Sequence, residues 1–137
     1  MNNTFPKFLN SYLDAWRNSS LIDLKNFISE DYKAREVTGG EIDDFGYKES
    51  ILGWEQGFNF AREHNAEWKI NVHATIPLRE DETMVILSAT LVIKEKHIET
   101  TNLFIQTFKK SDDSWKLLRS YIEAGVRSIS TNSIFYN

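Results

Sequence analysis

Hydrophobic residues in the first half of the chain recur mainly at helical spacing. A first stripe runs over residues 5–16, a second, shorter one over 20–28, and a third from Tyr47 to about His64. Intervals of three and four predict three amphipathic helices. Glycines at positions 53 and 57 lie inside the third helix, where each costs roughly 1 kcal/mol relative to alanine, so we expect them to pack closely against another element.

Two further segments separate the second and third helices. Residues 32–37 favour a short strand, and Gly39-Gly40 opens an acid-rich stretch that runs to about Gly46 and is interpreted as a loop.

After His64 the period changes from helical to alternating. Residues 68–78 alternate and predict a long strand with one apolar face, whereas 84–93 are apolar on both faces and predict a central strand. Two further strands are predicted over 98–109 and 114–125, with short polar turns between the four. This order predicts an α+β fold, in which a curved antiparallel sheet of four long strands and a short early strand is covered by three N-terminal helices. We expect one domain over residues 1–127 and a C-terminal tail over 128–137.

The last predicted strand, SWKLLRSYIEAG, carries unusual chemistry. Simple alternation gives it one face with Trp115, Leu117, Arg119, Tyr121 and Glu123, and another with Lys116, Leu118, Ser120, Ile122 and Ala124. The polar members of the first face would line a pocket or form a polar subunit interface, and the sequence leaves both open.

Composition narrows the function classes. The chain has 137 residues, 41% hydrophobic and 26% charged, and a net charge of −4 without a basic cluster. Nucleic-acid binding would need a clustered positive face, and no apolar stretch is long enough to cross a membrane. Because there is no cysteine and no signal peptide pattern, we expect a cytoplasmic protein without disulfides.

Two stretches resemble the nuclear transport factor 2-like superfamily, and its SnoaL-like and ketosteroid-isomerase-like members in particular. They are SYLDAWRNSSLIDLKNFISEDY near the start and DDSWKLLRSYIE near the end. The resemblance implies a cone-shaped α+β domain with an apolar pocket between helices and sheet, and a homodimer formed through the outer face of the sheet.

The resemblance to ketosteroid isomerase suggests catalytic candidates. It puts Tyr12 at the tyrosine that donates to an oxyanion and Glu36 at the carboxylate base, since the interval 36 − 12 = 24 matches that family. A partly desolvated carboxylate there would suit proton abstraction. Phe104 stands near the family's protonated aspartate and cannot donate a hydrogen bond, which argues against steroid isomerisation.

The resemblance to SnoaL-type cyclases and limonene-type epoxide hydrolases adds a third catalytic candidate. Their catalytic aspartate corresponds to Glu123 in the run Arg119-Ser120-Tyr121-Ile122-Glu123. The isomerase alignment instead turns Ser120 and Ile122 toward the pocket, so the inward face of this strand stays open.

Other residues are candidate ligand contacts: Trp16, Trp54, His73, Asn102, Phe104 and Tyr121. Gln106 is a possible polar fixture with Asn102. Each has an ordinary structural alternative in the core, at the surface or in an interface. His97 and Glu99 share a strand face, but no third ligand accompanies them, and no metal site is expected.

We therefore expect a small-molecule-binding protein for a small apolar organic ligand. It is either a cofactor-independent acid/base enzyme of isomerase, cyclase, dehydratase or hydrolase type, or a non-catalytic ligand-binding or dimerisation module. A flavin or haem holder is a third possibility that rests on aromatic content alone. No cofactor is expected, and the sequence does not identify the ligand.

Overall fold

The computed structural model describes residues 4–94, 96–97 and 100–127. Three helices are present in this part of the chain: α1 (Phe5–Arg17), α2 (Leu21–Lys25) and α3 (Tyr47–Glu63). The first and third match the predicted helical stretches closely, whereas α2 is shorter than predicted, because Ile28 already begins the first strand. The predicted tail, residues 128–137, lies outside the described residues.

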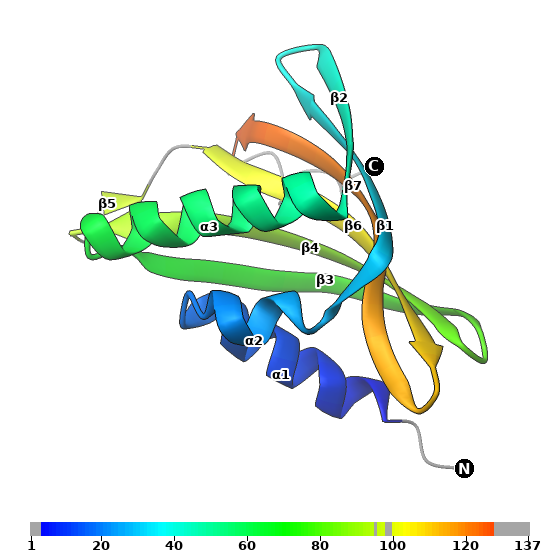
Figure 1. Ribbon diagram of the computed structural model, residues 1–137. Coiled ribbons are helices and arrows are strands. Elements are labelled where there is room, and N and C mark those ends of the chain that lie inside the picture. The colour runs from blue at the N-terminus through cyan, green and yellow to red at the C-terminus, as the bar shows by residue number, and fades with distance from the viewer. Residues whose placement is uncertain (1–3, 95, 98–99, 128–137) are drawn as a thin grey trace.

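The described strands form one sheet. They are β1 (Ile28–Thr38), β2 (Glu41–Gly46), β3 (Glu67–Arg79), β4 (Glu82–Ile93), β5 (Lys96–His97), β6 (Thr100–Ser111) and β7 (Ser114–Arg127). Their order in the sheet is β2-β1-β7-β6-β4-β3, with the short β5 paired to β4. All three helices lie on one side of this curved sheet, here called the concave face (Figure 1).

The expectation of a loop at residues 39–46 was wrong. β1 and β2 form a hairpin in which Thr38 pairs with Glu41, and the connecting Gly39 and Gly40 both have positive φ. Glycine adopts that backbone conformation without steric cost, which is why Gly-Gly is typical of two-residue hairpin turns.

The expectation of an antiparallel sheet with a short early strand also needs correction. β1 is 11 residues long and runs parallel to β7, with Ala34 opposite Ser120 and Glu36 opposite Ile122. The sheet is therefore mixed. This pairing joins segments more than 80 residues apart, which local patterns cannot reveal.

A β-bulge in β7 changes which residues face the helices. Phe108 pairs with Leu117, but Thr107 pairs with Arg119, so Leu118 is an extra residue. An extra residue reverses the alternation of faces beyond it. Trp115 and Leu117 are buried on the concave face before the bulge, and Ser120 and Ile122 are buried there after it.

A second bulge divides β3 in the same way. Val72 pairs with Leu87 and Ala74 with Ile86, so the residue between them, His73, is extra. Trp68 and Ile70 pack against the core on the concave face. Beyond the bulge, Ile76 pairs with Met84 on the outer face and is 38% exposed. The single continuous apolar face predicted for this strand was therefore wrong.

One end of the concave side is a closed aromatic core. Phe5 lies 4.9 Å from Trp115 and 5.5 Å from Phe108, and Tyr12 lies 5.1 Å from Phe108, measured between ring centroids. These side chains are almost fully buried. Burial of aromatic rings at edge-to-face angles supplies much of the stability of a domain of this size.

Candidate functional site

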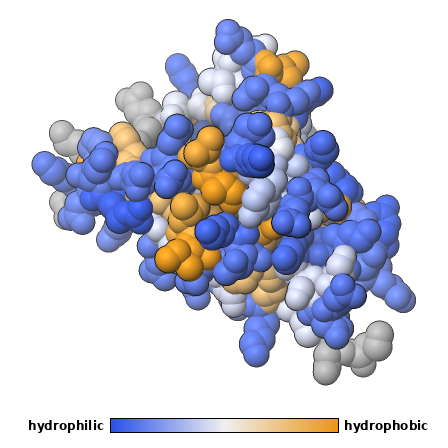
Figure 2. All heavy atoms as spheres, in the orientation of Figure 1, coloured by the Kyte–Doolittle hydropathy of each residue, from blue (hydrophilic) through white to orange (hydrophobic). Residues whose placement is uncertain are grey.

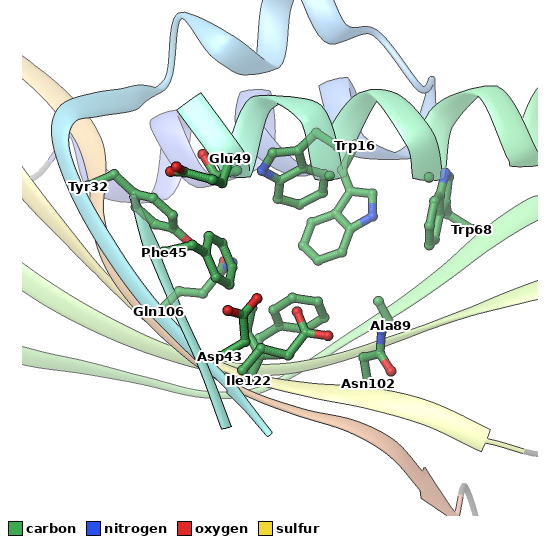
Figure 3. Close-up of a pocket in the computed structure, with 16 residues that line it drawn as sticks. Trp16, Tyr32, Asp43, Phe45, Glu49, Trp68, Ala89, Asn102, Gln106 and Ile122 are labelled. Carbon is green, nitrogen blue, oxygen red and sulfur yellow. The ribbon is translucent and has the colours of Figure 1, made fainter. Parts of the chain in front are cut away.

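A cavity occupies the other end of the concave side, between α1, α3 and the sheet. Its volume is about 330 Å³, at the small end of the range for small-molecule sites. The lining residues are Trp16, Tyr32, Glu36, Asp43, Phe45, Glu49, Ser50, Gly53, Trp54, Gly57, Trp68, Ala89, Asn102, Phe104, Gln106 and Ile122. Figure 3 shows the labelled side chains arranged around a central space.

Aromatic rings form the apolar wall of the cavity. Trp16 is at the centre of this cluster, with ring centroids 4.7 Å from Trp54, 5.1 Å from Phe104 and 6.1 Å from Trp68, all at steep interplanar angles. Trp68 donates its indole N–H to the hydroxyl of Ser19 at 3.1 Å. The indole N–H of Trp16 is buried and has no hydrogen-bond partner among the described residues. Trp16, Trp54 and Phe104, which the sequence suggested as ligand contacts, thus come together in one wall.

Two glycines of α3 help to keep this space open. A Cβ added at Gly53 would meet no atom within 4 Å, and one at Gly57 would meet the Trp68 ring at an ordinary 3.9 Å. Both positions line the cavity. The expectation that these glycines allow close packing was therefore wrong for Gly53, where the missing side chain leaves cavity volume instead.

Three carboxylates complete the lining: Glu36 on β1, Asp43 on β2 and Glu49 in the first turn of α3. Glu36 is half-buried, whereas the other two are exposed. The Glu49 carboxylate accepts from the backbone N–H of Gly46 at 3.1 Å. Backbone hydrogen bonds from Glu49 itself and from Gly46 hold the pKa of this carboxyl below its ordinary value, so it is ionised at neutral pH.

The tyrosine that lines the cavity is Tyr32, not Tyr12. Tyr32 is 3% exposed. Burial raises its pKa to about 12, and the negative charge of Glu36 acts in the same direction. Its hydroxyl therefore stays protonated over the physiological range.

Tyr12 is absent from the lining of the cavity. It is fully buried, and its hydroxyl donates to the side-chain oxygen of Gln106 at 2.9 Å. Burial raises the pKa of Tyr12 well above its ordinary value. The predicted pair of Tyr12 and Glu36 is thus not brought together, because the Tyr12 donor is already used inside the core and only Glu36 reaches the cavity.

Asn102 and Gln106 lie in the cavity wall, as the sequence suggested for polar fixtures. Asn102 lies on β6 opposite a bulge of β7, where its side-chain oxygen accepts from the backbone N–H of Gly125 at 3.0 Å. Both amide oxygens are occupied by protein donors, so the amide NH₂ groups are the parts of these side chains left to meet a ligand.

Tyr121, Glu123 and His73 lie on the outer face of the sheet, away from the cavity. The bulge at Leu118 turns Tyr121 outward, where it is 39% exposed and donates a hydrogen bond to Glu123 that raises the Tyr121 pKa. The His73 ring pairs with the hydroxyl of Ser88 at 2.8 Å on that same face. The pocket positions predicted for these three residues were therefore wrong.

Sequence reasoning missed the part of the site that β2 supplies. Asp43 and Phe45 fall within the predicted loop, and Glu49 is not among the candidates that the sequence suggested. The Gly39-Gly40 pair was a usable signal, because such a pair between two apolar-containing runs is typical of a hairpin. A hairpin there would have put Asp43 opposite Glu36.

Neither a cluster of metal-ligating side chains nor a membrane-spanning helix is found in the described part of the chain. No group of three His, Cys, Asp or Glu side chains there is arranged to hold a metal ion. The sequence candidates His97 and Glu99 lie outside the described side chains. None of the helices in residues 4–94, 96–97 and 100–127 is both long and apolar enough to cross a bilayer.

Comparison with known proteins bears on the fold alone. No family model matches the sequence, and no curated protein matches it. Among solved structures, an NTF-2-like protein of unknown function from Shewanella oneidensis superposes with a TM-score of 0.66 at 17% identity, covering 87% of this chain and 95% of that one. An NTF2-like protein from Cytophaga hutchinsonii gives 0.64 at 16% identity, over 90% of this chain and 99% of that one.

Two further solved structures agree. A putative calcium/calmodulin-dependent protein kinase type II association domain from Thiobacillus denitrificans has a TM-score of 0.66 at 14% identity, over 85% of this chain and 90% of that one. A cystatin-like domain of unknown function from Nostoc punctiforme has 0.65 at 15% identity, over 96% of this chain and 81% of that one. At these identities the likeness concerns architecture and not activity. This chain has the fold of the nuclear transport factor 2-like superfamily.

Proposed function

We propose that the protein binds a small, largely apolar organic molecule in the cavity between α1, α3 and the concave face of the sheet. The observation that carries the proposal is the cavity itself, about 330 Å³ and walled by tryptophan and phenylalanine rings. An apolar pocket with a few polar groups is the usual form of a small-molecule site. Asn102 and Gln106 supply such groups.

The α3 glycines add support because they keep volume free at a cost in helix propensity. A glycine inside a helix is roughly 1 kcal/mol less favourable than alanine. Gly53 has no close neighbour that would exclude a methyl group. If the cavity reflected only loose packing, alanine at position 53 would make the protein more stable. The presence of glycine is therefore better explained by a need for space in the cavity.

Binding is better supported than acid/base catalysis. The donor expected for catalysis, Tyr12, is bonded to Gln106 and does not line the cavity. Glu36 lines it and accepts a hydrogen bond from the Thr38 hydroxyl, and no hydrogen bond joins it to a general acid among the described residues. We therefore propose a binding site rather than a catalytic one. We also propose a cytosolic protein, because a chain without cysteine is compatible with a reducing compartment.

The test uses the distribution of tryptophans. Trp16, Trp54 and Trp68 line the cavity, whereas Trp115 lies in the closed core and donates to Thr4. Titration with small aromatic compounds, beginning with 2-phenylethanol, should change the intrinsic fluorescence. The Trp115→Phe variant should keep that response, and Trp54→Phe should reduce it.

A cavity-filling variant completes the test. Gly53→Leu places a side chain in the space and should abolish the response, while Leu52→Ala, on the exposed side of the same helix, should leave it intact. If Gly53→Leu keeps the fluorescence response, or if the response requires Trp115, ligands bind elsewhere.

A second candidate, homodimerisation through the outer face, has its own support. Four half-buried apolar side chains lie side by side there on β4 and β6: Met84, Ile86, Leu103 and Ile105. Tyr121 extends this strip onto β7, opposite Ile105. Such an apolar strip with a polar border is typical of subunit interfaces.

Light scattering after size-exclusion chromatography tests the dimer. Ile105→Glu should convert it to monomer. Ile22→Glu, at an apolar position of α2 that is 75% exposed, is the matched control and should not. Hydrophobic surface over the helices (Figure 2) makes this control informative, because a dimer through that surface would respond to Ile22→Glu instead.

A further inference from the structure

The charged residues in the cavity lining are all acidic. Glu36, Asp43 and Glu49 line it, and no lysine, arginine or histidine of the described residues does. A cavity with this lining has a negative potential that favours cations and disfavours carboxylate or phosphate groups.

Besides the backbone hydrogen bonds, the Lys48 charge attracts the Glu49 carboxylate and contributes to its lowered pKa, but the two groups form no ion pair. Among the described residues, no ion pair involves any of the three carboxylates. The hydrogen-bond donors to Glu36 and Glu49 are the neutral Thr38 hydroxyl and the Gly46 N–H. Asp44, next to Asp43 in sequence, is instead held by the Arg35 guanidinium at 2.7 and 2.8 Å on the outer face. Acids at this hairpin are therefore paired with arginine outside the cavity and left unpaired inside it.

The register of the β1–β2 hairpin sharpens this contrast. Glu36 and Asp43 are direct cross-strand partners. Like charges directly opposite each other in an antiparallel pair destabilise the pairing. The hairpin thus carries an unfavourable arrangement at the cavity, and a cation placed between the two carboxylates would relieve it.

Aromatic side chains stand next to these acids. Tyr32 and Phe45 belong to the same two strands, and Trp54 lies one turn beyond Glu49 on α3. Figure 3 shows Tyr32, Phe45 and Glu49 at one end of the cavity and Trp68 at the other. Ring faces attract ammonium groups, and the combination of rings with carboxylates is typical of sites for organic cations.

The Trp16 indole adds an observation independent of charge. Its buried N–H has no hydrogen-bond partner among the described residues. A buried donor left unpaired costs free energy, which an acceptor atom on a ligand or a bound water would recover.

We propose, on the basis of the binding function above, that the ligand is an organic cation: an amine or quaternary ammonium group on a small apolar or aromatic body. The ammonium group lies at the Glu36, Asp43 and Glu49 end, and the body packs among Trp16, Trp54 and Trp68. A metal ion is a poorer occupant, because no three acidic or histidine side chains of the described residues converge as metal ligands do.

The test compares three compounds of nearly equal size and different charge. They are phenethylamine, which is cationic at pH 7, the neutral 2-phenylethanol and the anionic 3-phenylpropionate. Affinities are measured by calorimetry or by protein NMR titration. We expect phenethylamine to bind at least tenfold more tightly than 2-phenylethanol and 3-phenylpropionate to bind most weakly.

Matched variants test whether the carboxylates of the cavity cause the preference for the amine over the alcohol. In Glu36→Gln and Asp43→Asn the ratio of amine to alcohol affinity should fall several-fold, with the alcohol affinity itself little changed. Asp44→Asn, which removes a carboxylate of the same hairpin on the outer face, should keep the wild-type ratio. On the wild-type protein, 0.5 M NaCl should reduce the ratio as well, a readout that needs no variant.

The outcomes separate the two proposals. If 2-phenylethanol or 3-phenylpropionate binds as tightly as phenethylamine, the cavity binds ligands but the cation preference is wrong. An amine preference that Glu36→Gln and Asp43→Asn both retain also contradicts it. If none of the three compounds binds at millimolar concentration, the binding function fails, and the cation preference fails with it.

Discussion

The two ends of the concave side are built from the same kinds of residue and have opposite packing. At the closed end, Phe5, Phe108 and Trp115 meet ring to ring, and no space remains. At the open end, the Trp16 ring lies 4.7 Å from Trp54 and 6.1 Å from Trp68 between centroids, yet these rings line a cavity. Aromatic content therefore does not decide whether a core is filled.

The difference comes from the neighbours of the rings. The open end faces two glycines on α3 and three unpaired carboxylates from β1, β2 and α3. Missing side chains leave volume, and charged groups keep their end of that volume accessible to water or to a ligand. The closed end has neither feature, so its aromatic side chains are almost fully buried.

The largest expected effect is on the stability of the closed end. Phe108→Ala should cost about 3–5 kcal/mol in the free energy of unfolding, because it leaves a void among packed rings. Phe45→Ala, in the half-buried cavity wall, should cost about 1–2 kcal/mol. Guanidinium unfolding of both variants measures the difference. Equal losses would mean that the open end is packed as tightly as the closed one.

The stability of the protein should depend on Tyr32 in alkaline solution. Tyr32 titrates near 10 when unfolded, but burial raises its pKa to about 12 in the folded protein. The folded state then holds the proton more tightly, which contributes on the order of 2–3 kcal/mol below pH ~10 and is lost as the pH rises toward ~12. Tyr32→Phe should flatten the fall in stability over that interval.

Tyr12 is present in both proteins, and besides burial the charge of an ionised Tyr32 raises the Tyr12 pKa, so the difference from wild type reports Tyr32 together with this coupling. Urea unfolding at several pH values from ~9 to ~12 supplies the measurement. Parallel curves for the two proteins would show that the Tyr32 hydroxyl is not held in a desolvated place at the cavity.

Gly53→Ala should stabilise the open end. Its backbone is helical and nothing lies within 4 Å of the added Cβ, so the variant should gain about 0.5–1 kcal/mol from helix propensity. Thermal unfolding should show a raised Tm. A lowered Tm would indicate that α3 lies closer to the sheet than the cavity allows.

The smallest effects concern the two aspartates of the hairpin. Asp43→Asn should raise stability by a few tenths of a kcal/mol, because it removes the repulsion with Glu36. Asp44→Asn should lower stability, since it removes the carboxylate that accepts both hydrogen bonds from the Arg35 guanidinium, the group that lowers the Asp44 pKa. Both changes should shrink at high salt. If both variants change the stability in the same direction, the aspartate on the cavity side and the one on the outer side do not differ in their charge interactions.

Local patterns predicted the elements of this fold well and the contents of the site only in part. Helical spacing identified α1, α2 and α3, and alternation identified β3, β4, β6 and β7 with small errors at their ends. Trp16, Trp54, Glu36, Asn102 and Phe104 were expected near a ligand and do line the cavity. Trp16, Trp54 and Phe104 lie on regular stretches, where the period of the chain fixes the direction of the side chain. Glu36 came from the family resemblance.

What the sequence by itself determined is therefore the set of elements and the α+β class, because periodicity is a local property of the chain. Only the tertiary structure decided which side chains meet in the cavity. The bulge at Leu118 turned Tyr121 and Glu123 outward, and the parallel pairing of β1 with β7 brought Glu36 beside Ile122. Bulges and long-range pairings are set by cross-strand hydrogen bonding and by packing against the helices. A single extra residue reverses every face beyond it, and no local pattern records where that residue falls.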